Sequence, residues 1–287
     1  MIQNAGTSSI KRCTRSDNLH PLLHPAGCIV PCITVHQISQ LVVWDLNLYT
    51  PEIAREVLDL CQKENFELTA VWCGWSGPVH WGYPDMYYSL GLVPAYMRAQ
   101  RVNELLKGAE FAHLLGVRDV ITHIGYFPDD PFDANHVEIV QCVRLIGQTL
   151  AQRGQRFLFE TGEELPVTLL QLMRETGLDN LGVNFDPANL MMSGRANSLD
   201  ALRMFRGCLY GVHAKDGRYP DVANGKVKGT QTPLGEGETQ FREIVRMLKE
   251  FGYEGDITIE REIDDPVVRR RDLAQAKCLL NEWMKEA

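Results

Sequence analysis

Residues 156–186 read RFLFETGEELPVTLLQLMRETGLDNLGVNFD, and the architecture of the chain can be inferred outward from them. The stretch opens with a short apolar run at 156–160, continues as an amphipathic segment at 166–176, and closes with a second apolar run at 181–185. Short runs rich in Phe, Val and Leu predict buried strands, whereas apolar residues spaced by three and four predict a helix. A strand–helix–strand unit places its two strands parallel in one sheet.

The same alternation extends over most of the chain. Strands are expected at 41–44, 66–73, 117–124, 156–160, 181–185, 208–213 and 256–260, and helices at 51–64, 95–115, 135–153, 166–176, 198–206, 239–251 and 265–285. A candidate eighth strand lies at 27–35. Eight alternating units in roughly 250 residues predict an α/β protein with a (β/α)8 TIM barrel. The alternative is a doubly wound open sheet, which usually carries a glycine-rich phosphate fingerprint that this chain lacks.

The N-terminal part departs from this pattern. Residues 1–40 show no helix-period pattern, and prolines at positions 21, 25 and 31 interrupt them. The barrel is therefore expected to have an atypical or incomplete first βα unit. We expect residues 1–26 to be peripheral or poorly ordered and residues 27–287 to form one barrel domain.

Composition excludes several classes of protein. The 287 residues are 45% hydrophobic and 23% charged, which is typical of a soluble globular protein, and no apolar run is long enough for a membrane helix. A net charge of −8 disfavours nucleic acid as the main partner, because such binding rests on clustered Lys and Arg. Eight scattered cysteines without a CxxC pair, and a poor match to a signal peptide, predict a reduced, cytoplasmic protein.

Metal-capable side chains end the last four predicted strands: Glu160, Asp186, His213 and Glu260. Because the C-terminal ends of barrel strands surround a common mouth, we expect these side chains to lie together. Three carboxylates and one imidazole suit Mn²⁺ first, with Mg²⁺, Co²⁺ or Zn²⁺ as alternatives. Any one of them could simply cap a helix or meet solvent, so the coincidence of all four favours a site. Glu262 is the main rival of Glu260.

Five segments carry a family resemblance: FLFETGEE (157–164), NFDPANLMMSG (184–194), VHAKDGRYP (212–220), LGEGE (234–238) and TIEREI (258–263). In this order they resemble the xylose isomerase-like TIM barrels, a family of sugar phosphate isomerases and epimerases related to D-tagatose 3-epimerase. The resemblance covers roughly residues 45–285. It implies the same metal set, and it implies that Glu160 and Glu260 act as acid and base on opposite faces of a sugar carbon.

Six further residues are candidates for substrate binding, because they lie at or near the expected mouth: Trp75, Trp81, His123, Asn189, Lys215 and Arg218. Two long loops, 74–94 and 214–238, follow strands and contain several of them, and long loops at this face are usually functional. The tryptophans could instead form a small core of their loop. His123 could be structural, and Lys215 could pair with Asp216 or Glu236.

Asn189 marks a departure from the family. The epimerases carry an Asp-x-x-His pattern in which the histidine contacts substrate, whereas this chain has Asn189 after Asp186 at that spacing. An amide can hydrogen-bond a hydroxyl group but does not transfer a proton near neutral pH. A structural role in helix capping is the alternative for Asn189.

These features predict a divalent-metal-dependent isomerase or epimerase of a sugar or sugar phosphate that works through an enediolate. The alternative is a lyase or dehydratase acting on a keto-sugar or keto-inositol, with His123 or Lys215 assisting the leaving group. A third reading is an inactive barrel that binds carbohydrate. A nuclease of the endonuclease IV type is disfavoured, because it needs more histidine ligands than His123 and His213. The expected partner is a small molecule, not nucleic acid or a membrane, and a homo-oligomer is left open.

Overall fold

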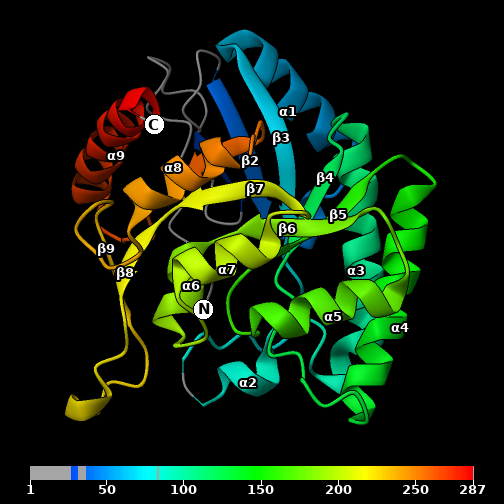
Figure 1. Cartoon of the computed structure of the whole chain (residues 1–287). Coiled ribbons are helices and arrows are strands. Elements are labelled where there is room, and N and C mark those ends of the chain that lie inside the picture. Colours follow the sequence, from blue (N-terminus) through cyan, green and yellow to red (C-terminus); the bar gives the residue numbers. More distant parts are fainter. Residues whose placement is uncertain (1–26, 32–36, 83, 287) are drawn as a thin grey trace.

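A computed structural model describes residues 27–31, 37–82 and 84–286 of the chain (Figure 1). The expectations for residues 1–26 and 32–36 lie outside the described residues. Seven parallel strands form most of one sheet, in the order β2 (Gln37–Val43), β3 (Phe66–Cys73), β4 (Asp119–Thr122), β5 (Arg156–Glu160), β6 (Leu181–Phe185), β7 (Leu209–Ala214) and β10 (Asp256–Ile259). β10 also contacts β2, so the sheet curls into a nearly closed barrel. The predicted TIM barrel is confirmed.

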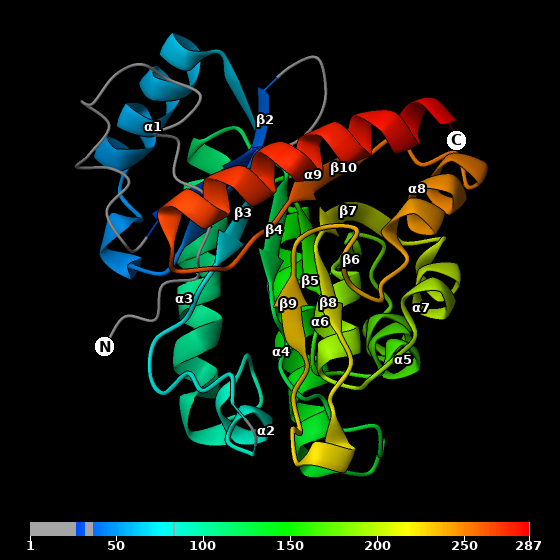
Figure 2. The same ribbon diagram turned by 90° about the vertical axis from the view of Figure 1, so that its left-hand side faces the viewer.

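Helices cover the outside of this barrel, as Figures 1 and 2 show. The long ones are α1 (Pro51–Glu64), α3 (Ala95–Leu114), α4 (Ala134–Ala151), α5 (Pro166–Thr176), α7 (Ser198–Phe205), α8 (Phe241–Glu250) and α9 (Pro266–Glu286). Their bounds agree with the predicted ranges to within two residues. Within the described part of the chain, no helix has both the length and the apolar character needed to cross a membrane.

The first unit differs from that of a regular barrel. β1 (Gly27–Pro31) pairs with β2 in the antiparallel sense, with Gly27 opposite Val43. Only residues 32–36 separate the two strands, and a parallel pair needs a crossover of about a dozen residues or more. The candidate strand at 27–35 therefore exists in part, but it does not continue the parallel alternation. The expected atypical first unit is confirmed.

Local signals explain where α1 begins and ends. The hydroxyl of Thr50 accepts a hydrogen bond from the Ile53 N–H, and Pro51 occupies the first turn, where its missing N–H costs nothing. At the other end, Asn65 adopts a left-handed conformation with φ of 55°. This conformation is tolerated by Asn and ends the helix before β3 begins.

Side chains from the barrel strands alternate between two apolar cores. Ala70 and Trp72 of β3 point into the barrel, where they pack with Ile121 and Leu158. Val71 and Cys73 of the same strand belong to the larger core between strands and helices. Successive side chains of an extended strand point to opposite sides of the sheet, and this alternation produces the division. The inward-pointing side chains at the ends of the strands therefore lie at the mouth of the barrel.

Two long loops contain short elements that the sequence analysis did not predict. Loop 74–94 contains α2 (Met86–Ser89), and the 214–238 loop contains a hairpin of β8 (Asp216–Arg218) and β9 (Thr230–Thr232) with a 3₁₀ turn at Val222–Asn224. A short helix, α6 (Pro187–Met192), follows β6 directly, and Leu46–Leu48 is a 3₁₀ turn. Figure 2 shows the hairpin beside α6 at the mouth of the barrel.

Buried polar side chains hold both loops in place. The Arg101 guanidinium, fully buried on α3, donates hydrogen bonds to the carbonyl oxygens of Ser76, Pro78, Ser89 and Gly91. The Asp216 carboxylate accepts from the backbone N–H groups of Gly217, Gly235, Gly237 and Thr239. Lys228 Nζ donates to the Trp81 carbonyl at 2.8 Å and so joins the two loops. Loop 74–94 is thus a fixed wall of the mouth.

Arg101→Met should lower the free energy of unfolding by about 3 kcal/mol or more, because carbonyl groups are left buried without donors. Urea denaturation measures the change, and limited proteolysis should show faster cleavage within 74–94. Lys107→Met, an exposed change on the same helix, is the control and should leave both measurements unchanged. Wild-type stability in Arg101→Met would contradict this account of the loop.

Candidate metal centre

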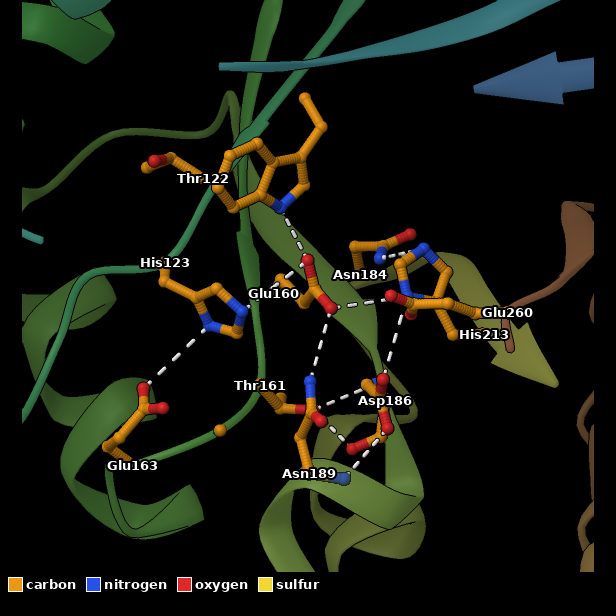
Figure 3. Close-up of polar contacts among 12 residues, drawn as sticks. Thr122, His123, Glu160, Thr161, Glu163, Asn184, Asp186, Asn189, His213 and Glu260 are labelled. Atoms are coloured by element: carbon orange, nitrogen blue, oxygen red, sulfur yellow. Dashed lines mark hydrogen bonds and ion pairs between the residues drawn. The ribbon is translucent and has the colours of Figure 1, made fainter. Parts of the chain in front are cut away.

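The structure brings the four strand-end residues together at the mouth of the barrel (Figure 3). Glu160 is the last residue of β5, Asp186 follows β6, His213 lies in β7 and Glu260 follows β10. One candidate ligand atom from each residue lies within 4.8 Å of the others. Three of the side chains are buried, and that of Glu260 is nearly so.

His213 Nδ1 stands at the centre of this group. It lies 2.7 Å from Glu260 Oε2, 3.2 Å from Glu160 Oε1 and 3.7 Å from Asp186 Oδ2. Nevertheless His213 Nδ1, Asp186 Oδ2 and Glu260 Oε2 are buried without a partner in hydrogen-bonding geometry. Buried polar atoms in native proteins nearly always have partners. Unpartnered oxygen and nitrogen atoms that converge on one point therefore fit a divalent cation.

The electrostatics of the group agree with a cation site. Burial opposes the charged form of His213, but Glu260 and Glu160 outweigh it and raise the pKa of this imidazole well above its usual value. Burial likewise opposes ionisation of Glu160, and the neighbouring His123 and His213 lower its pKa below the usual range. The three carboxylates thus create a negative electrostatic potential at the cluster, and this potential stabilises a positive charge there.

Both oxygens of Glu160 are held by neutral donors. Trp72 Nε1 donates to Oε2 at 2.5 Å, and Asn189 Nδ2 donates to Oε1 at 3.2 Å. Helix α6 is capped by the Asp186 side chain, which accepts from the Asn189 backbone N–H at 2.8 Å. The Asn189 side chain therefore orients Glu160 and takes no part in capping.

Lys215 distinguishes the roles of Glu260 and Glu262, the two glutamates that could serve as the fourth ligand. Its Nζ lies 2.7 Å from Glu262 Oε2 and 3.4 Å from Asp186 Oδ2 and Glu260 Oε1, and the side chain is almost fully buried. Glu260 is thus one of the clustered candidate ligands, whereas Glu262 pairs with the ammonium group, is partly exposed and is not part of the cluster. The alternative pairing of Lys215 with Asp216 is not what the structure has, since Asp216 shapes its own loop.

The candidate substrate contacts separate into two groups. His123 Nε2 lies 3.6 Å from Glu160 Oε2, and the Trp81 ring packs edge-on against His123 at 5.2 Å, so both line the mouth. Trp75 is only 3% exposed and packs against Trp72 in the interior core, which agrees with the loop-core alternative. Arg218 is exposed and donates to the Glu236 carbonyl, and the structure does not bring it to the cluster.

Three residues around the centre were missed by the sequence analysis: Gln40, Trp72 and Asn184. Gln40 and Asn184 both lie against the His213 ring, and Trp72 contacts Glu160. A signal exists for Trp72 and Asn184, because each lies within a predicted strand and shares its inward face by two-residue alternation. Gln40 lies one residue before the strand predicted at 41–44, in the part of β2 that the sequence analysis did not predict. A polar residue inside an otherwise apolar buried strand, such as Asn184 in LGVNF, is the feature to look for.

The fold and the site define a TIM barrel with a candidate metal centre at its C-terminal mouth. Comparison with known families identifies it more closely: the chain belongs to the xylose isomerase-like TIM barrel family, whose profile matches residues 34–286. A xylose isomerase domain protein from Planctomyces limnophilus is 32% identical in sequence. Its crystal structure superimposes with a TM-score of 0.83 and covers 87% of this chain and 89% of that protein.

Other relatives carry different activities in their names. An inosose dehydratase from Clostridium botulinum (strain Alaska E43 / Type E3) is 28% identical over 145 residues, which are 45% of this chain and 48% of the dehydratase. The chain spans less than half the length of the curated relatives it matches. A D-tagatose 3-epimerase-like protein shares the fold at 20% identity, with a TM-score of 0.64 over 87% of this chain and 91% of that one. A dehydratase is thus named among the sequence relatives, and an epimerase-like protein among the proteins of the same fold.

Glu160→Gln and His213→Ala should each weaken Mn²⁺ binding by more than the roughly 10–100-fold that loss of an outer partner of a ligand costs. Each variant removes an atom that the cation would contact directly. Metal analysis and calorimetric titration with Mn²⁺ measure the change, with Glu262→Gln as the neighbouring control. Unchanged metal content in both variants would move the site elsewhere.

The stability of the protein should depend on pH through the buried carboxyl group of Glu164. Glu164 is 1% exposed, and burial beside Glu163 raises its pKa from 4.5 to about 8. The folded state then binds this proton more tightly than the unfolded state, so stability contributed by Glu164 falls as pH rises from about 4.5 to about 8. Glu164→Gln should be more stable than wild type at pH 8 and similar to it at pH 4.5.

Urea denaturation at the two pH values tests this, with the exposed Glu56→Gln as control. An unchanged pH dependence in Glu164→Gln would show that another group is responsible.

Proposed function

We propose that this protein is a divalent-metal-dependent epimerase or isomerase of a sugar or sugar phosphate that acts through an enediolate. The observation that carries the proposal is a pair of carboxylates, Glu160 and Glu260, which reach one cluster from separate strands. Two bases that approach one point from different elements can serve opposite faces of a carbon atom. Mn²⁺ is the ion we expect, with Mg²⁺, Co²⁺ or Zn²⁺ as alternatives.

A cation held by Glu160, Asp186, His213 and Glu260 would polarise a substrate carbonyl and stabilise the negative charge of the enediolate. One glutamate, which starts as the carboxylate, accepts the proton from the carbon next to the carbonyl, and the other, which starts protonated, donates its proton to the enediolate. Return to the same carbon from the opposite face is epimerisation, and return to the neighbouring carbon is isomerisation. The two glutamates exchange roles when the reaction runs backward.

The residues around the pair have supporting roles in this proposal. Trp72 and Asn189 donate to the two oxygens of Glu160 and hold its carboxylate in one orientation. Lys215, which lies 3.4 Å from Glu260, limits the repulsion among the buried carboxylates. His123 and Trp81 are the proposed substrate contacts at the mouth. A water-poor site of this kind strengthens each electrostatic interaction within it.

A dehydratase of a keto-sugar or keto-inositol is the second candidate, and the sequence likeness to an inosose dehydratase favours it. The first step is the same proton abstraction, but the electron pair then expels a β-hydroxyl group. His123 is the acid we propose for that step. Although burial opposes its charge, Glu160 and Glu163 raise the pKa of His123 above its usual value, which favours the protonated ring that this step needs.

The deciding experiment is incubation of the protein with Mn²⁺, D₂O and a panel of ketoses, their phosphates and keto-inositols. Deuterium at the carbon next to the carbonyl establishes enolisation, and the product distinguishes an epimer, an isomer and a dehydrated compound. Glu160→Gln and Glu260→Gln should each lose at least about 10² in kcat, the lower range for a general base.

Glu262→Gln is the register control and should retain more activity than Glu260→Gln. If Glu160→Gln and Glu260→Gln both turn over normally, the mechanism with two carboxylates is wrong. If no compound in the panel exchanges deuterium, the inactive carbohydrate-binding barrel becomes the better explanation.

A further inference from the structure

The two ring nitrogens of His213 have different surroundings. Nδ1 faces the candidate ligands Glu160, Asp186 and Glu260, as described above. Nε2 points to the opposite side, into the barrel, where it lies 2.8 Å from Gln40 Oε1 and 2.9 Å from Asn184 Nδ2. The Gln40 and Asn184 side chains are 3% and 0% exposed, so water does not compete for these contacts.

Asn184 determines which end of the Gln40 amide faces the histidine. Gln40 Nε2 donates a hydrogen bond to Asn184 Oδ1 at 3.2 Å, which leaves Gln40 Oε1 toward His213. A carbonyl oxygen can only accept, so the 2.8 Å contact is a hydrogen bond when His213 Nε2 carries the ring proton. The Asn184 amide nitrogen lies 2.9 Å from the same atom and can only donate, so it would bond to an unprotonated Nε2. The two contacts are therefore alternatives, and a cation that takes the electron pair of Nδ1 selects the contact with Gln40.

The space for this arrangement is provided by a glycine. A Cβ atom on Gly211 of β7 would lie 2.1 Å from Asn184 Oδ1, closer than any real contact. Gly211 stands two residues before His213, on the same side of the strand. Three strands, β2, β6 and β7, therefore combine to seat the two amides behind the imidazole.

We propose that Gln40 is a positioning residue of the metal centre, because its amide oxygen accepts the Nε2 proton of His213 and leaves Nδ1 to bind the cation. A neutral imidazole carries one ring proton, so a proton held on Nε2 leaves the electron pair of Nδ1 free. Outer partners of this kind fix the tautomer and the ring orientation of ligating histidines. The inference rests on the metal site of the proposed function.

Gln40 gives the atypical first unit of the barrel a role in the metal centre. Gln40 lies 173 positions before His213 in the chain, in the strand that pairs with β1. The candidate ligands come from the later half of the chain, yet the orientation of one of them depends on β2. The irregular start of the barrel is thus part of the centre.

Two substitutions of Gln40 separate positioning from packing. Gln40→Met keeps the length of the side chain and removes the amide, and it should raise the Kd for Mn²⁺ about 10-fold or more. Gln40→Glu keeps an accepting oxygen, and its Kd for Mn²⁺ should stay within about 3-fold of wild type or become tighter. Calorimetric titration with Mn²⁺ alone measures both, and thermal denaturation reports folding.

Gln155→Met is the matched control. Gln155 is an equally buried glutamine whose amide donates to the Ala109 and Val117 carbonyls, away from the centre. This variant should lose stability and keep the wild-type affinity for Mn²⁺. A purely structural role for Gln40 would make Gln40→Met behave in the same way, and that result would overturn the proposal.

A spectrum of the wild-type protein gives a second test that needs no variant. With ¹⁵N-labelled histidine and saturating Zn²⁺, which is diamagnetic, His213 should show a protonated Nε2 and a metal-bound Nδ1. The reverse assignment would overturn the proposal even if Gln40→Met fails to fold. If wild type binds no divalent ion, the proposed function and this inference fall together. If Gln40→Met loses Mn²⁺ affinity while no ketose exchanges deuterium, the proposed function fails and the inference stands.

Discussion

Three carboxylates buried around one imidazole nitrogen are the constraint on which the rest of this structure depends. Negative charges brought together away from water repel one another and lose hydration, so they persist only with compensating positive charge and donors. The chain supplies Lys215 as its own positive group, and Trp72 as a neutral donor. The remaining unpartnered ligand atoms are what a divalent cation would satisfy.

The barrel makes this concentration of charge possible. Parallel strands end at one mouth, and the hydrogen bonds of the sheet hold their last residues within a few ångströms of one another. The loops then build the walls. Arg101 binds four carbonyl groups of loop 74–94, and Asp216 gathers the backbone of its own loop, so both walls are anchored by buried charge.

The same centre is compatible with several reactions that share one first step. Epimerisation, isomerisation and dehydration all begin when a proton leaves the carbon next to a polarised carbonyl, and they differ in where the electron pair goes. The difference therefore resides in the residues that face the substrate away from the cation. In this chain His123 and Trp81 are the proposed substrate contacts, and Asn189, which holds Glu160, stands at the spacing where the epimerases have histidine.

Much of the barrel and the four candidate ligands could be predicted from the sequence, because strand and helix periods are local and because barrel strands bring their ends together. Other features are decided by residues far apart in the chain. The antiparallel β1 depends on pairing with β2, the burial of Trp75 on the interior core, and the choice of Glu260 over Glu262 on the position of Lys215. The contact of Gln40 with His213 joins residues that are 173 positions apart in the chain. Local pattern specifies which way a side chain points along its own strand, but only the closed barrel determines which side chain it meets.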